Sequence, residues 1–101
     1  MHAATLLLTV VLAGAAPQDA SLESERARAA GLLEAGQPAR AAELVRSLLL
    51  RQDSAALRNL LGDALEAAGD LLGAAEEFQK AAHADPSEEH LFDWGNCLLQ
   101  L

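Results

Sequence analysis

The side chains best suited to metal chemistry gather near the end of the chain: His83, Asp85, His90 and Cys97. Imidazole, carboxylate and thiolate groups bind zinc and related metals, and paired helical histidines normally stand three or four residues apart. Here Pro86 breaks the helix between the two histidines, and one cysteine cannot form an internal disulfide or a cysteine zinc site. We therefore expect no metal site and interpret Cys97 as a small core residue. In an exported protein its unpaired thiol could instead form an intermolecular bond.

No other combination of residues points to catalysis. The chain lacks the Gly-x-Ser-x-Gly motif of a nucleophilic serine, a glycine-rich phosphate loop and a His-Glu-x-x-His zinc helix. Its carboxylates follow expected helix faces and helix starts. We therefore expect a protein that is not an enzyme and that needs no cofactor.

Composition and charge favour a small helical protein. The 101 residues suffice for one small domain, 51% are hydrophobic, and the chain is rich in Ala and Leu with only three aromatic residues, which favours helix over strand. The net charge is −8, and residues 59–101 carry nine acidic residues against Lys80 alone. Such a surface repels phosphate groups, so we expect no nucleic-acid partner.

The first residues of the chain resemble an export signal. Residues 1–18 contain no Asp, Glu, Lys or Arg, and the apolar run from Ala3 to Ala13 leads into small residues. This pattern predicts a signal peptide over residues 1–16, with cleavage after Ala15 and a mature chain that begins near Ala16 in the periplasm or cell envelope. The alternatives are the first helix of a cytoplasmic protein and an uncleaved membrane anchor, although about 14 apolar residues are few for a bilayer.

Similar residues recur every 33 positions along the rest of the chain. A fixed period of this size is typical of stacked repeats, in which each unit covers the apolar face of its neighbour. The equivalent positions are Ala29 with Gly62 and Gly95, Leu32 with Leu65 and Leu98, Gly36 with Gly69, Ala41-Ala42-Glu43 with Ala74-Ala75-Glu76, and Val45 with Phe78.

Turn and capping residues divide this region into five expected helices. Gly36 and Gly69 stand where a left-handed residue would end a helix. Asp85 is expected to cap the last helix, with Pro86 in its first turn and Glu88 completing a capping box. The expected helices span about Ser21 to Ala35, Pro38 to Arg51, Ser54 to Ala68, Leu71 to Ala84, and Pro86 to the end.

These residues resemble the tetratricopeptide repeat (TPR) family. The matching positions are Leu61-Gly62, Leu65, Gly69-Asp70, Ala74, Phe78, Ala81 and Pro86, which cover one complete unit. The resemblance implies an all-α solenoid of antiparallel helix hairpins, about two and a half repeats long. A degenerate unit over residues 20–53, with Arg28 and Asp53 at two departures from the pattern, precedes the complete unit over 54–86. Residues 87–101 correspond to the first helix of a third unit, which we interpret as the truncated end of a longer array.

The same register implies how the helices pack. The small residues at Ala29, Gly62 and Gly95, and at Ala41 and Ala74, would let helices cross closely, while Val45 and Phe78 fill the space between them. Ankyrin repeats share the period of 33, but their Thr-Pro-Leu-His phrase is absent and the expected helices are too long.

The resemblance also implies a binding groove, because ligands of this family normally lie on the concave face formed by the first helices. We expect an acidic groove for a basic or amphipathic peptide, with Phe92 as an aromatic anchor. The alternatives are a solvated helix face and, for Phe92 and Trp94, simple packing. The family's Lys, Arg and Asn clamp for a terminal carboxylate is not expected. The expected groove residues are Glu23, Arg26, Asn59, Asp63, Glu66, Phe92 and Asn96.

The function predicted from these features is protein–protein interaction, as an adaptor or assembly factor in the bacterial cell envelope. The alternative is a structural module that self-associates. The last segment favours that alternative, because its apolar residues would lack cover: Leu91, Phe92, Trp94, Leu98, Leu99 and Leu101.

Overall fold

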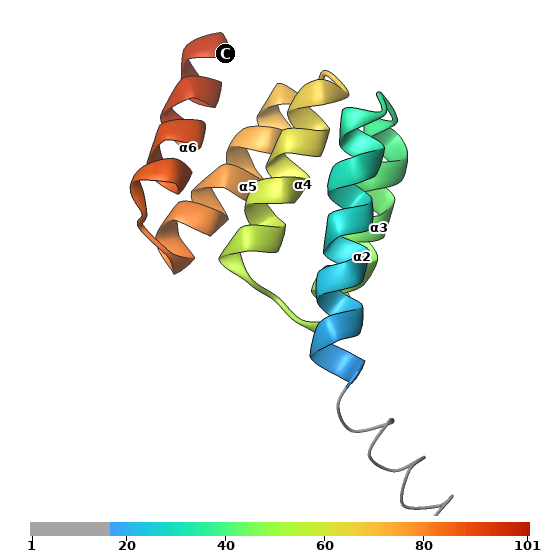
Figure 1. The fold of residues 1–101 in the computed structure, drawn as a ribbon. Coiled ribbons are helices and arrows are strands. Elements are labelled where there is room, and N and C mark those ends of the chain that lie inside the picture. Colours follow the sequence, from blue (N-terminus) through green and yellow to red (C-terminus); the bar gives the residue numbers. More distant parts are fainter. Residues whose placement is uncertain (1–16) are drawn as a thin grey trace, which may run out of the picture.

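The computed structural model describes residues 17–101, which form five α-helices (Figure 1). These are α2 (Pro17–Glu34), α3 (Pro38–Arg51), α4 (Ala55–Ala67), α5 (Leu71–Ala84) and α6 (Glu88–Gln100). The all-α prediction is confirmed. The first helix begins earlier than predicted, at Pro17, a residue that the first turn of a helix tolerates. The predicted signal peptide, residues 1–16, lies outside the described residues.

Two glycine turns join α2 to α3 and α4 to α5, as the sequence predicts. Gly36 and Gly69 have φ angles of 77° and 90°, in the left-handed region. The amide of Gly36 donates to the carbonyl of Leu33 at 3.1 Å, and the amide of Gln37 donates to that of Leu32 at 2.9 Å. The end of α4 has the same pair of bonds. These bonds satisfy carbonyl groups that the helix itself leaves free.

The start of α6 differs from the prediction. Ser87, not Asp85, is the N-cap, and its hydroxyl accepts a hydrogen bond from the amide of His90 at 3.3 Å. Asp85 instead ends α5, where its amide donates to the carbonyl of Ala81. The cause is Pro86, whose ring disfavours a helical conformation at the preceding residue and holds Asp85 extended. The predicted capping box is therefore wrong.

Replacing Ser87 with alanine should lower the free energy of unfolding by about 1 kcal/mol, because the first turn of α6 loses its side-chain acceptor. The control is Asp85→Ala, which removes an exposed carboxylate that caps no helix and should have a smaller effect. Urea denaturation followed by circular dichroism measures both. A larger loss of unfolding free energy for Asp85→Ala than for Ser87→Ala would indicate that Asp85 is the N-cap of α6, as the sequence predicted.

The helices form two layers. Each helix packs against the next in the chain, and α4 also contacts α2 and α6, so α2, α4 and α6 line one side and α3 and α5 the other (Figure 1). The core between them contains Ala29, Ala41, Val45, Phe78 and Cys97, all at most 1% exposed. Small residues thus allow close helix contacts while Val45 and Phe78 fill the intervening space, as predicted.

A close helix contact lies between α4 and α5, at Gly62. A Cβ atom built there would lie 2.5 Å from Cε1 of Phe78, which is far inside van der Waals contact. The equivalent small residue of α6, Gly95, is different, because a Cβ there meets nothing within 4 Å. The prediction of a close crossing at Gly95 is therefore wrong. Among residues 17–101, no helix packs against that side of α6.

Candidate functional site

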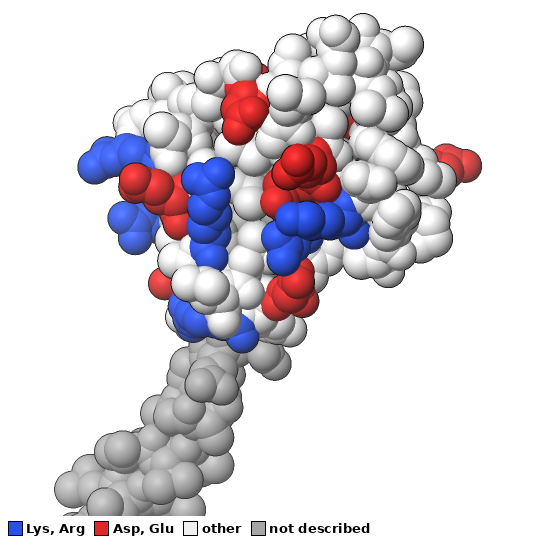
Figure 2. Space-filling view, turned by 180° about the vertical axis from the view of Figure 1, so that it is seen from behind, with Lys and Arg blue, Asp and Glu red and all other residues white. Residues whose placement is uncertain are grey.

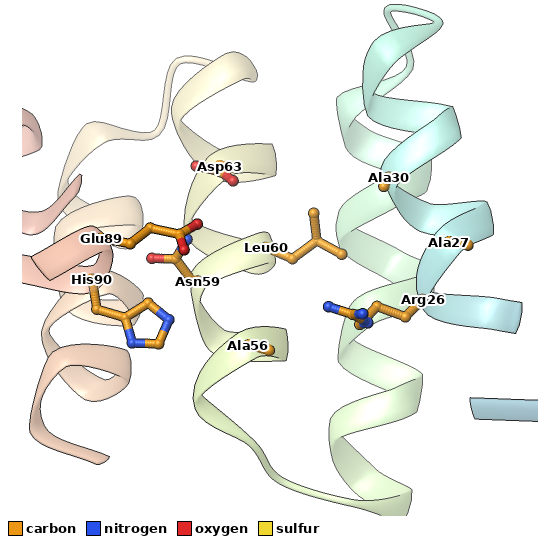
Figure 3. A pocket seen from close by; sticks show the side chains of 9 residues that line it. All are labelled: Arg26, Ala27, Ala30, Ala56, Asn59, Leu60, Asp63, Glu89 and His90. Carbon is orange, nitrogen blue, oxygen red and sulfur yellow. The ribbon is translucent and has the colours of Figure 1, made fainter. Parts of the chain in front are cut away.

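A depression of about 340 Å³ opens on the side formed by α2, α4 and α6 (Figure 3). Its lining combines three alanines and Leu60 with polar side chains. Arg26 faces the depression from α2, whereas Asn59, Asp63 and Glu89 lie together on the opposite side, at α4 and α6 (Figure 3). The full lining is Arg26, Ala27, Ala30, Ala56, Asn59, Leu60, Asp63, Glu89 and His90.

Three of the seven predicted groove residues meet in this depression: Arg26, Asn59 and Asp63. Asn59 and Asp63 stand four residues apart on α4, which places them one above the other on the same helix face. Arg26 comes from α2, which packs against α4. The depression therefore brings together predicted groove residues from α2 and α4.

The other four predicted residues lie around it. Glu23 accepts two hydrogen bonds from Arg26, both 2.9 Å long, and lines a second, adjoining depression. Glu66 accepts a hydrogen bond from the Gln100 side chain at 2.9 Å. Phe92, which is 70% exposed, and Asn96, which is also exposed, line neither depression.

The sequence analysis missed Glu89, His90 and Asp93. The 33-residue register transfers Asn59 and Asp63 to Phe92 and Asn96, but α6 faces α4 with a different side. The α6 residues that form hydrogen bonds with α4 are Asp93 and Gln100, seven residues and about two helical turns apart. Glu89 and Asp93 are four residues apart and so lie on one helix face, beside His90. This spacing was the sequence signal that could have indicated an acidic side of α6 near the depression.

Asn59 connects α4 to α6 through its amide. Its Nδ2 donates a hydrogen bond to Oδ2 of Asp93 at 3.0 Å. The residue is only 7% exposed, and its Oδ1 has no hydrogen-bond partner among the described residues. Most buried polar atoms in proteins are paired, so an orphaned acceptor is an unusual feature.

Several acidic side chains surround Asp63. Burial, together with the charges of Asp93, Glu66 and Glu89, raises the pKa of Asp63 to about 6. A raised carboxyl pKa means that the folded state favours the protonated form. Ionised Asp63 therefore destabilises the fold, and this penalty grows as the pH rises from about 4 to about 6.

His90 has a fixed orientation beside these carboxylates. Its Nδ1 lies 2.8 Å from the carbonyl oxygen of Asp85, and because a carbonyl can only accept, Nδ1 is the donor. In the neutral ring, Nε2 is then an acceptor. The ring itself is 8% exposed.

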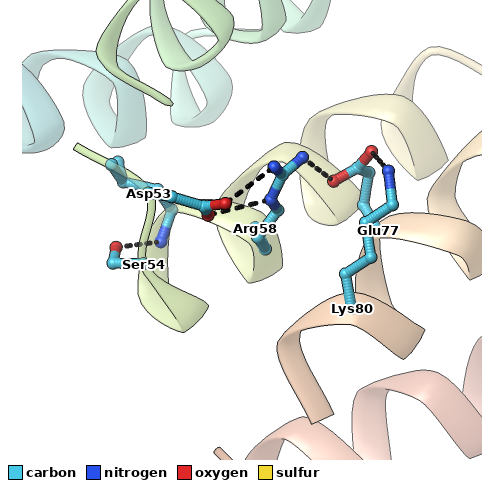
Figure 4. A network of polar contacts seen from close by, with 6 residues as sticks. Asp53, Ser54, Arg58, Glu77 and Lys80 are labelled. Atoms are coloured by element: carbon cyan, nitrogen blue, oxygen red, sulfur yellow. Dashed lines mark hydrogen bonds and ion pairs between the residues drawn. The ribbon is translucent and has the colours of Figure 1, made fainter. Parts of the chain in front are cut away.

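A second polar cluster, on the other face, holds the helices together (Figure 4). Arg58 donates two hydrogen bonds to Asp53 and one to Glu77, each 3.0 Å long, and Lys80 donates to Glu77 at 3.1 Å. The hydrogen bond from Arg58 holds the pKa of Asp53 below its usual range. Asp53, one of the departures from the TPR pattern, thus ties the α3–α4 linker to α4. We assign this cluster a structural role.

The remaining groups with possible chemistry do not form a site. Cys97 is fully buried, its Sγ lies 3.6 Å from the carbonyl oxygen of Leu71, and burial raises the pKa of its thiol. This agrees with the predicted core role. Within the described part of the chain, no three His, Cys, Asp or Glu residues converge as metal ligands, and none of its helices is long and apolar enough to cross a bilayer.

No family model, curated protein or solved structure matches the chain. The function therefore has to be argued from the depression and from the exposed surface around it.

Proposed function

We propose that the protein is a protein-interaction module of the TPR type, which binds a basic or amphipathic segment of another protein in the depression between α2, α4 and α6. The observation that carries this proposal is the convergence of Arg26, Asn59 and Asp63 with Glu89 at one open depression. An open, acidic lining steers and orients a positively charged partner.

The equivalence of the two hairpins supports the TPR part of the proposal. Gly36 and Gly69 close their hairpins with the same backbone bonds, and Ala41 and Ala74 are both fully buried. In this proposal α6 is the first helix of a third unit. The module acts as an adaptor or assembly factor, and the apolar residues 1–16 direct it to the cell envelope.

A photo-crosslinking amino acid at position 27 tests the proposal in the native host. Ala27 is exposed and lines the depression, so p-benzoylphenylalanine at this position should crosslink to a different protein. The matched control is the same replacement at Ala39, an exposed residue of α3 that lines none of the depressions described above. We expect a heterologous adduct from position 27 only.

The mass of the adduct separates the possible results. An adduct of twice the mass of the mature chain would indicate a second copy and support self-association instead. Equal crosslinking from positions 27 and 39, or none from position 27, would contradict binding in the depression.

The second candidate function is self-association, and the outer side of α6 favours it. This helix exposes several large apolar side chains, which is typical of an interaction surface. The end of the molecule formed by α6 also carries little charge, whereas acidic and basic residues intermingle elsewhere on the same face (Figure 2). The exposed residues, which we call the α6 outer face, are Leu91, Phe92, Leu98, Leu99 and Leu101.

A further inference from the structure

We propose that the wall of the depression formed by α4 and α6 is a subsite for one organic cation, the ammonium or guanidinium group of a lysine or arginine side chain. The residues of this cation subsite are Asn59, Asp63, Glu89 and Asp93. The inference rests on the proposed function and specifies which chemical group of the bound segment is recognised.

The first argument is the buried acceptor of Asn59. Its Oδ1 has no partner, and Figure 3 shows the amide pointing from α4 towards Glu89 and His90 of α6. Turning the amide over would place Oδ1 against the carboxylate of Asp93, which now accepts the hydrogen bond from Nδ2. This repulsion fixes the orientation. Asn59 therefore presents an acceptor that no described residue satisfies.

The second argument is that the groups around Asn59 are also acceptors. Asp63, Glu89 and Asp93 bear carboxylates, so the wall attracts cations and repels anions. The facing cation, Arg26, is already held by Glu23 through two hydrogen bonds. Since no three potential metal ligands converge among residues 17–101, an ammonium or guanidinium group, which brings several donors, fits this set better than a metal ion.

The charge of Asp63 makes this recognition depend on pH. The groups that face it are Glu66 on its own helix, Glu89, His90 and Asp93 from α6, and Arg26 from α2. Because the pKa of Asp63 is about 6, its ionised fraction rises from about one-tenth at pH 5 to about nine-tenths at pH 7. Affinity for a cation should therefore rise about tenfold over this range, and binding should release protons near pH 5.

The probe for the test is n-butylammonium, which reproduces the lysine side chain, and its neutral control is 1-butanol. NMR of ¹⁵N-labelled protein at pH 7 and constant ionic strength should show saturable shifts of the Asn59 side-chain amide and of the Leu60 and Asp63 backbone amides. A probe of this size should bind with a Kd on the order of 1–10 mM. Equal shifts with 1-butanol, or no saturation with n-butylammonium, would overturn the proposal.

Two variants test the assigned groups. Asp63→Asn removes one charge with little change in size and should weaken binding about tenfold. The control Glu76→Gln removes the same charge from an exposed position on α5 and should change the Kd less than about twofold. Equal weakening by both variants would indicate only a general charge effect. A pH dependence that persists in Asp63→Asn would overturn its assignment to Asp63.

The third variant, Asn59→Leu, keeps the branching of the side chain but removes both the orphaned acceptor and the donor to Asp93. It should weaken n-butylammonium binding about tenfold and lower the urea midpoint only slightly, because the lost hydrogen bond to Asp93 is partly offset by the removal of a buried unpaired acceptor. Wild-type affinity in this variant would exclude a role for Asn59. Cation binding without a crosslinked protein would reject the proposed function alone, whereas a crosslinked protein without cation binding would reject the subsite alone.

Discussion

Gly62→Leu should destabilise the protein by about 1–3 kcal/mol, because α4 and α5 approach too closely at this position to admit a side chain. Even a single Cβ atom would lie 2.5 Å from one ring atom of Phe78 and 2.6 Å from another. The ring cannot move aside easily, since Phe78 is 1% exposed and packed within the core. The variant must therefore displace α5 or force the ring from its rotamer.

The natural control is Gly95→Leu, at the equivalent position of α6. No atom lies within 4 Å of a Cβ there, so the substitution should be neutral or should stabilise the helix by up to about 1 kcal/mol, because leucine is a better helix former than glycine. Urea denaturation at low protein concentration compares the two variants. Equal effects on stability at positions 62 and 95 would contradict a close contact specific to Gly62 and would show that the α4–α5 contact is looser than the structure indicates.

A double variant identifies the cause of the effect. Phe78→Ala alone should cost about 3–5 kcal/mol, because it leaves a cavity in the core. In the double variant, the leucine at position 62 can occupy part of that cavity. The combined loss should then be smaller than the sum of the two single losses, since contacting residues are not independent. Strict additivity would contradict direct contact between these two positions.

Much of the fold could be predicted because its determinants are local. The left-handed turns follow from Gly36 and Gly69, and the core positions of Val45 and Phe78 follow from the 33-residue register. These features need only short-range backbone geometry and the burial of one helix face. The resemblance to the TPR family also implies that these helices stack as a solenoid, and this arrangement remains a proposal.

The features that could not be predicted depend on competition between candidate cap residues and on contacts between helices. Asp85 and Ser87 are both good caps, and the constraint of Pro86 on its neighbour decides between them. The 33-residue register assigned Phe92 to the groove, although Glu89 and His90 are the α6 residues that reach the depression. The unpaired Oδ1 of Asn59 depends on where Asp93 lies in space, which a single sequence does not reveal.

The protein should self-associate at micromolar concentrations if the α6 outer face is its interface. Phe92 is 70% exposed and Leu99 is 88% exposed, with Leu91 and Leu98 each 47% exposed beside them. If about 300 Å² of this apolar surface is buried in each copy, at roughly 25 cal/mol per Å², the gain is several kcal/mol per copy. Association loses rotational and translational freedom, so only part of this gain appears as affinity.

Analytical ultracentrifugation of wild-type protein and two double variants decides this prediction. Replacing Leu98 and Leu99 by glutamate places charge on the α6 outer face and should give a monomer. The control replaces Leu50 and Leu72, which are 90% and 71% exposed on α3 and α5, and adds the same charge away from that face. The control should associate like the wild type, since moderate salt screens distant charges. A wild-type monomer at high micromolar concentration, or equal dissociation of both double variants, would exclude α6 as the interface and leave the depression as the interaction surface.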